Sequence, residues 1–99
     1  MAVSTPLTRQ IRPLASTDHA RGHFRVLASL TSGTDPGEAA WRERFHELAR
    51  SNASASKYFV VVIVSKETDE LVATGTVFLE PKFLRNLASA AHIEDIAVD

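Results

Sequence analysis

Two adjacent carboxylates, Glu94 and Asp95, are the residues of this 99-residue chain best suited to chemistry. They stand between Ile93 and Ile96, in an apolar segment that is typical of a buried strand. Ionised carboxylates are costly to bury unless a partner compensates their charge. We therefore expect Glu94 and Asp95 either to meet a ligand or to form an ion pair with another element. From composition alone, the structural ion pair is the more common explanation.

Both carboxylates can serve one site only if the strand that carries them is irregular. Neighbouring residues of a regular strand point to opposite faces of the sheet. A β-bulge would re-aim one of the two side chains, and bulges recur beside active sites. Gly75, in the preceding strand, marks a bulge or a close approach of the backbone. We therefore predict a distortion of the strand at Glu94 and Asp95.

A basic segment precedes that strand. Lys82 and Arg85 carry an ammonium and a guanidinium group, which suit a phosphate monoester. Without further information, a solvated loop is the more common explanation for such charges. The histidines His19, His23 and His46 are spread over two expected helices without the spacing of metal ligands, which favours surface or half-buried structural roles and no metal site.

Composition excludes several classes of function. A net charge of −1 gives no electrostatic attraction to nucleic acid or to an anionic membrane. The chain has no cysteine, which excludes a thiolate metal site and a cysteine nucleophile. The longest apolar run, from Tyr58 to Val64, is too short to span a membrane. The N-terminus has no pattern of a signal peptide, so we expect an intracellular, cytoplasmic protein.

Hydrophobic periodicity predicts an α+β fold. After a flexible leader over 1–8, we expect a strand over 10–14, a helix from Ser16 or Thr17 to about 31, a helix over 36–56, strands over 58–64 and 71–80, a connection over 82–91 and a strand over 92–98. Two helices followed by a strand meander indicate a sheet with helices packed on it. The strand over 58–64 is expected to be buried on both faces.

The helical faces follow from the spacing of apolar residues. In the first helix, Phe24, Leu27 and Ala28 share one face. The second helix has an apolar stripe whose members are Trp41, Phe45, Leu48 and Ala49. We interpret these as core residues of a single domain over 9–99.

This order of elements resembles the N-terminal half of the GNAT N-acetyltransferase fold. Three segments are more specific and are similar to the glucosamine 6-phosphate N-acetyltransferase family: 72–76 (VATGT), 80–85 (EPKFLR) and 92–98 (HIEDIAV). The segments 11–14 (IRPL) and 21–27 (RGHFRVL) are also similar to that family. The resemblance covers about residues 10–99.

The resemblance implies an activity. In that family, acetyl-CoA donates its acetyl group to the amine of D-glucosamine 6-phosphate on the way to UDP-N-acetylglucosamine, and two subunits of a homodimer contribute to each sugar site. Direct attack of an amine on a thioester requires a deprotonated amine, donors for the developing oxyanion and good positioning, without a covalent nucleophile. The proton acceptor could be a backbone carbonyl, a carboxylate or water.

The resemblance also implies site residues. Thr31 and the stretch Lys82, Phe83, Leu84 and Arg85 would lie at the sugar phosphate and ring. Glu94, Asp95 and Ile96 would line the sugar and its reacting amine, with the two carboxylates as catalytic residues. The backbone of Ile96, Ala97 and Val98 would run along the pantetheine arm of the coenzyme. Arg85 stands where members of the family often carry a histidine.

Two motifs of the family are missing from the sequence. They are the glycine-rich loop that cradles the coenzyme pyrophosphate at a helix N-terminus and the later tyrosine that assists the leaving thiolate. We therefore expect the chain to be the N-terminal portion of a GNAT domain that is not active by itself. The alternative is a non-catalytic α+β module for binding or dimerisation.

Overall fold

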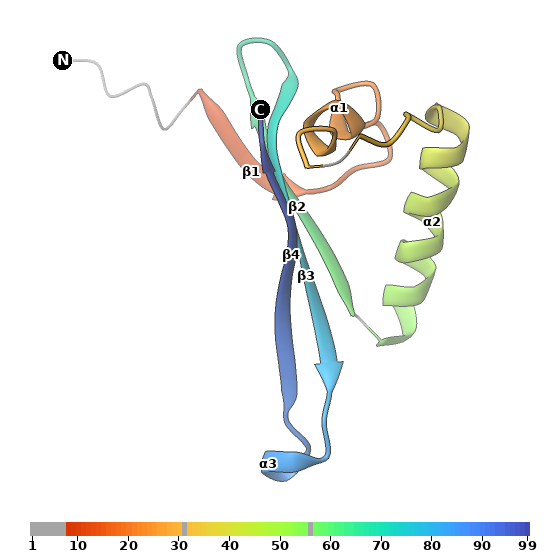
Figure 1. Cartoon of the computed structure of the whole chain (residues 1–99), viewed down its shortest axis with the longest axis vertical. Coiled ribbons are helices and arrows are strands. Elements are labelled where there is room, and N and C mark those ends of the chain that lie inside the picture. The colour runs from red at the N-terminus through yellow and green to blue at the C-terminus, as the bar shows by residue number, and fades with distance from the viewer. Residues whose placement is uncertain (1–7, 31, 56) are drawn as a thin grey trace, which may run out of the picture.

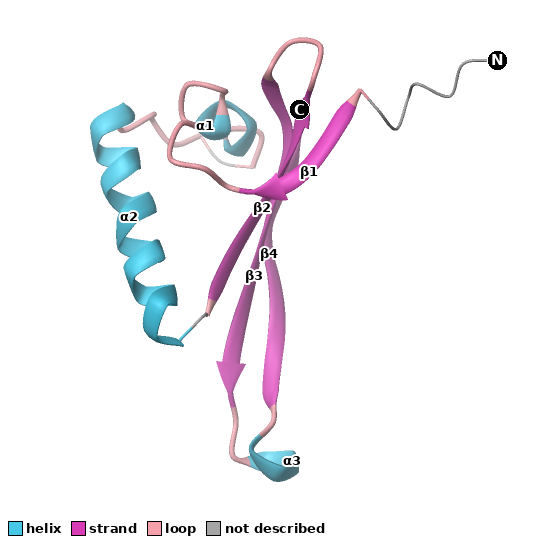
Figure 2. Cartoon of the chain, turned by 180° about the vertical axis from the view of Figure 1, so that it is seen from behind, coloured by secondary structure: helices cyan, strands magenta, loops and turns pink. Residues whose placement is uncertain are grey.

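The computed structural model of the chain describes residues 8–30, 32–55 and 57–99. Four antiparallel strands form a sheet in the order β1-β2-β3-β4, and their bounds are Arg9–Pro13, Tyr58–Ser65, Glu70–Pro81 and Ser89–Val98. The helices are α1 (His23–Leu27), α2 (Glu38–Ala55) and the short α3 (Leu84–Leu87). Figures 1 and 2 show α1 and α2 on the same side of the sheet. The predicted α+β architecture is confirmed.

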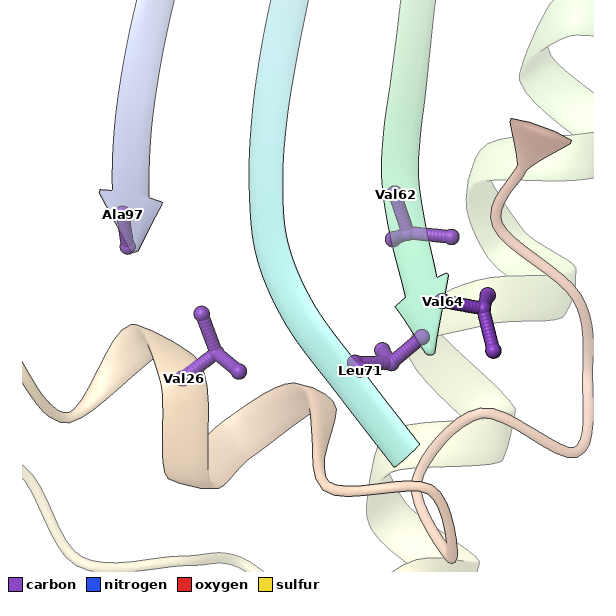
Figure 3. Close-up of a cluster of buried hydrophobic side chains, with 5 residues drawn as sticks. All are labelled: Val26, Val62, Val64, Leu71 and Ala97. Atoms are coloured by element: carbon purple, nitrogen blue, oxygen red, sulfur yellow. The ribbon is translucent and has the colours of Figure 1, made fainter. Parts of the chain in front are cut away.

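The hydrophobic core lies between α1 and the sheet. It consists of Val26, Val62, Val64, Leu71 and Ala97, which Figure 3 shows on α1, β2, β3 and β4. The opposite face of the sheet is open among the described residues, since Val61 and Ile11 are 38% and 71% exposed. The prediction that β2 is buried on both faces is therefore wrong, because both helices cover the same face.

The helix predicted from Ser16 or Thr17 begins later than expected. Residues 16–22 form turns, and α1 begins after Gly22, whose φ of 98° suits a residue without a side chain. The face of α1 that packs on the sheet carries His23 and Val26 rather than Phe24, Leu27 and Ala28. The predicted face is wrong because a polar residue, His23, occupies a core position, where both of its ring nitrogens are hydrogen-bonded.

The second predicted helix is confirmed as α2. The Asp35 carboxylate accepts a hydrogen bond from the amide of Gly37 (2.9 Å), which is the residue directly before α2. Trp41 is buried and stacks on Phe45 with 5.8 Å between ring centroids. Glu38 and Arg42 form an ion pair one turn apart, at 3.2 Å.

The β3–β4 hairpin extends beyond β2 and ends at α3, which is the lowest point of the chain in Figure 1. Its turn is irregular, because Arg85, Asn86 and Leu87 all have positive φ angles between 54° and 65°. β4 begins at Ser89, three residues before the predicted start, and pairs there with Pro81. The hairpin is therefore longer than the sequence predicts.

Candidate functional site

A β-bulge lies at the two carboxylates of β4. Thr76 pairs with Glu94 and Thr74 pairs with Ala97, so that Gly75 faces two residues, Asp95 and Ile96. Asp95 has a φ of 51°, in the left-handed region that Asp tolerates better than most residues. The predicted distortion is confirmed, with the extra residue on β4 and Gly75 on the strand opposite it.

The carboxylates themselves are exposed, not buried. Glu94 and Asp95 both lie on the surface, and β4 as a whole has one buried residue, Ala97. Within the described residues, neither carboxylate takes part in an ion pair or a side-chain hydrogen bond. The prediction of a buried strand is wrong because β4 is an edge strand whose outer face and outer edge are uncovered in this part of the chain. The two charges are left in water and free to meet a ligand.

The last residues of β4 differ in their surroundings. Ala97 is 3% exposed and belongs to the core, whereas Ile96 and Val98 are 59% and 69% exposed on the open face of the sheet. A methyl group placed on Gly75 would lie 3.9 Å from Cγ1 of Ile96, which is an ordinary van der Waals contact. Within the described residues, the outer edge of β4 has no neighbouring strand, and its backbone groups there can bond a ligand.

The basic segment lies at the far end of the hairpin. The Lys82 ammonium pairs with the Glu80 carboxylate at 3.1 Å. Phe83 and Leu84 are 92% and 78% exposed, and Arg85 has the left-handed backbone of the turn. These residues form a protruding apolar and basic tip.

The structure does not bring this tip to the carboxylates of the same chain. Pro81 pairs with Ser89, and Glu94 lies five residues further along β4. At about 3.4 Å per residue, this separation is roughly 17 Å along the strand. Thr31, the other predicted phosphate ligand, lies outside the described residues.

A buried ion-pair network near the start of the chain was not predicted. Asp18 is fully buried and accepts two hydrogen bonds of 2.8 Å from the Arg12 guanidinium and one of 2.7 Å from the Ala15 amide. Arg21 lies 3.4 Å from the same carboxylate. Burial alone would raise the pKa of Asp18, but the hydrogen bonds from Arg12 and Ala15 and the nearby guanidinium charges outweigh it and hold this pKa below its usual range.

A second polar cluster lies between the helices and β3, on the covered face of the sheet. His23 is 7% exposed and contacts Trp41 of α2 and Thr74 of β3 through its two ring nitrogens. Its pKa is lowered chiefly by burial, and the charge of Asp18 opposes this effect. The prediction of a surface or half-buried histidine is therefore wrong. No local sequence signal predicts the contact, because Thr74 lies 51 residues further along the chain.

His92 pairs with an exposed carboxylate. Its Nε2 atom lies 2.9 Å from Glu80 Oε1, and its ring stacks on Phe78. The hydrogen bonds from His92 and then from Lys82 lower the pKa of Glu80. His92 is therefore paired within the described part of the fold.

No group of three or more candidate metal ligands occurs in the described ranges. Over the same ranges, none of the helices combines the length and apolar character that a membrane crossing requires.

Relatives of the chain share one name. The chain is 38% identical over 90 residues to glucosamine 6-phosphate N-acetyltransferase 1 of Oryza sativa subsp. japonica, which covers 91% of the chain and 53% of the relative. It is 34% identical over 92 residues to glucosamine 6-phosphate N-acetyltransferase of Arabidopsis thaliana, covering 93% of the chain and 60% of the relative. The chain therefore spans little more than half the length of these relatives. No protein-family model matches it.

Solved structures agree with this similarity. The crystal structure of glucosamine-6-phosphate N-acetyltransferase from Arabidopsis thaliana superimposes with a TM-score of 0.84 at 34% identity, over 93% of this chain and 60% of that chain. A Trypanosoma brucei acetyltransferase superimposes with a TM-score of 0.73 at 24% identity, over 92% and 60%, which shows a common fold. In sequence and fold, the chain is thus similar to glucosamine 6-phosphate N-acetyltransferases over little more than half of their length.

Proposed function

We propose that this chain supplies the acceptor side of an enzyme that transfers the acetyl group of acetyl-CoA to the amine of D-glucosamine 6-phosphate. The observation that carries the proposal is the bulge of β4, which presents Glu94 and Asp95 exposed and unpaired within the described residues. The names of the relatives support the substrate. The product, N-acetyl-D-glucosamine 6-phosphate, would serve the synthesis of UDP-N-acetylglucosamine.

The carboxylates would orient the sugar. Glu94 and Asp95 can accept hydrogen bonds from the amine and from hydroxyl groups of the acceptor. The amine nitrogen forms a bond to the thioester carbonyl carbon, the carbon–sulfur bond breaks, and the proton lost by the nitrogen is balanced by the proton that the sulfur gains. A carboxylate, a backbone carbonyl or water would accept the proton from the amine. No covalent enzyme intermediate is needed.

The bulge would also serve the donor substrate. Acetyl-CoA, as co-substrate, brings the acetyl group as a thioester. The irregular pairing at Asp95 and Ile96 frees backbone N–H groups that could stabilise the developing oxyanion. The open edge of β4 at Ile96, Ala97 and Val98 fits an extended pantetheine arm, because such an edge bonds amide groups as a neighbouring strand would.

The sugar phosphate would be held by the basic tip. Lys82 and Arg85 offer charges for the phosphate, Phe83 and Leu84 offer apolar contacts for the sugar ring, and Thr31 would add a hydroxyl donor. Because the tip lies roughly 17 Å from the carboxylates along its own strand, these two groups cannot share a small ligand within one chain. We therefore propose a homodimer in which the tip of one copy serves the carboxylates of the other.

A thiol-release assay tests the proposal. The whole 99-residue chain would be joined to the part of the Arabidopsis relative that it does not cover, and release of coenzyme A thiol would be measured. We expect release with glucosamine 6-phosphate, less release with glucosamine and none with glucose 6-phosphate, which has no amine. The Arabidopsis protein serves as the control for the shared C-terminal part.

Two results would contradict the proposal. The first is a chimera that melts cooperatively and binds acetyl-CoA but releases no thiol with either amino sugar, which would favour a non-catalytic module. The second is equal turnover of glucosamine and glucosamine 6-phosphate, which would remove the role of the basic tip.

A further inference from the structure

Four elements meet in a series of hydrogen bonds on the covered face of the sheet. Trp41 Nε1 of α2 lies 3.0 Å from His23 Nδ1 of α1, and His23 Nε2 lies 3.2 Å from Thr74 Oγ1 of β3. Thr74 Oγ1 in turn lies 3.5 Å from the carbonyl oxygen of Val61 in β2. All three side chains are at most 8% exposed. No step of the proposed reaction uses them.

The donors and acceptors in this series of hydrogen bonds have one consistent direction. An indole N–H can donate but cannot accept, so Nδ1 of His23 must carry a lone pair. The proton of the neutral ring then sits on Nε2 and is donated to Thr74 Oγ1. The Thr74 hydroxyl remains free to donate to the Val61 carbonyl. The arrangement therefore requires a neutral imidazole in one tautomer.

The series of hydrogen bonds ends at the border of the β4 bulge. Thr74 pairs with Ala97, which is the regular pair next to Asp95 and Ile96. Val26 lies three residues after His23 on the same face of α1 and packs in the core with Ala97 (Figure 3). One face of α1 thus contacts both members of the pair, through a hydrogen bond to Thr74 and through apolar packing on Ala97.

We propose that Trp41, His23 and Thr74 form a positioning device that fixes the β4 bulge, and that the device holds only while the His23 ring is neutral. The importance of the bulge rests on the proposed function, whereas the device itself concerns the folded chain. His23 is a positioning residue, because it acts on the carboxylate segment through Thr74 and does not itself touch a ligand.

Protonation would break the device at a definite point. A proton on Nδ1 would place an N–H group against the indole N–H of Trp41, and two donors cannot bond each other. Among the described residues, Asp18 favours the cation of His23 and His19 disfavours it, while the groups that face the ring from α2 and β3 are the uncharged Trp41 and Thr74. Because burial lowers the pKa of His23, protonation is expected below the ordinary histidine value of about 6.5.

Tryptophan fluorescence reports on the contact directly, since Trp41 is the single tryptophan of the chain. We expect the emission of the whole chain to change in one transition with a midpoint below about pH 6.5. His23→Gln should abolish this transition. The matched control is His19→Gln, because the His19 ring also lies beside Trp41, with 5.9 Å between ring centroids, and the transition should persist in this variant.

Amide hydrogen exchange at Ala97, which pairs with Thr74 at the border of the bulge, tests the positioning. Thr74→Val keeps the shape of the side chain and removes the hydroxyl, whereas Thr74→Ser keeps the hydroxyl. Loss of one buried hydrogen bond should speed exchange at the Ala97 amide about tenfold in Thr74→Val at pH 7, and Thr74→Ser should stay within about twofold of the original chain.

Two results would overturn the proposal. A fluorescence transition that disappears in His19→Gln and survives in His23→Gln would overturn the proposal. So would an exchange rate at Ala97 that is the same in Thr74→Val and Thr74→Ser. Neither measurement needs turnover. A folded, acetyl-CoA-binding chimera without activity, together with the expected fluorescence and exchange in the chain itself, would reject the acetyl transfer and leave the positioning device standing.

Discussion

Asp18 and Asp95 have the same side chain in opposite surroundings. Asp18 is fully buried, and its carboxylate is held by Arg12 and the Ala15 amide. Asp95 stands on the surface of an edge strand, in a left-handed backbone conformation, with no side-chain partner among the described residues. A carboxylate that is hydrogen-bonded and ion-paired within the fold contributes to stability. A carboxylate that is left unpaired at a backbone irregularity is available for a ligand.

The largest effect that we predict from this comparison is on stability. Asp18→Asn would place an amide N–H₂ group against the Arg12 donors and remove the buried charge that they pair with. We expect the free energy of unfolding to fall by about 3 kcal/mol, because one partner of a buried pair is lost. Urea unfolding of the chain measures this value. A loss of less than about 1 kcal/mol would mean that the network contributes little beyond a surface pair.

Acid should reveal the same residue. The pKa of Asp18 is lower in the folded chain than in the unfolded chain, so the unfolded state takes up a proton first as the pH falls. The contribution of Asp18 is therefore complete above its unfolded pKa of about 3.9 and is lost as the pH falls through its folded pKa. We expect stability to fall below about pH 4 with a slope of up to about 1.4 kcal/mol per pH unit from this group. In Asp18→Asn that part of the slope should vanish, and an unchanged slope would assign the acid sensitivity to other carboxylates.

The basic tip extends the comparison to cations. Arg12 is bound to a buried carboxylate, whereas Lys82 pairs with the exposed Glu80 and can exchange that partner for a phosphate. In the chimera, Lys82→Ala should raise the KM for glucosamine 6-phosphate about tenfold and leave the KM for acetyl-CoA unchanged, because a charged contact to the sugar phosphate is lost. Lys57→Ala, a lysine just before β2, is the control. Equal changes in both KM values would count against the tip as a phosphate site.

The smallest predicted effect is the stability of Asp95→Asn. Asparagine tolerates the left-handed backbone as well as aspartate does, and no ion pair is lost. We expect the free energy of unfolding, measured in urea, to change by no more than about 0.5 kcal/mol. A loss comparable to that of Asp18→Asn would show that Asp95 is a structural residue and would remove the contrast between the two sites.

The sequence predicts local features of this fold better than distant contacts. β2 and α2 follow from their β-branched run and apolar stripe, and the bulge was predicted from the hypothesis that two neighbouring carboxylates serve one site. The burial of β4 was predicted wrongly, because apolar composition does not reveal which face of a strand the helices cover. The phase of α1 was also predicted wrongly, since His23 is buried only through its bonds to Trp41 and Thr74.

The site residues divide in the same way. Glu94 and Asp95 could be singled out because charges within an apolar run conflict with burial. The roughly 17 Å that separate them from the basic tip could not be foreseen, because it depends on the length and register of the β3–β4 hairpin. The role of Asp18 at the centre of an ion-pair network could not be predicted either.

The turnover of Asp95→Asn in the chimera tests the role of the bulge most directly. Its matched control is Asp69→Asn, since Asp69 is also exposed and has a similar φ of 57° in the β2–β3 turn. If Asp95 orients the amino sugar, kcat/KM for glucosamine 6-phosphate should fall about 10- to 100-fold in Asp95→Asn and stay unchanged in Asp69→Asn. Original turnover in Asp95→Asn, with the melting temperature also unchanged, would contradict the account.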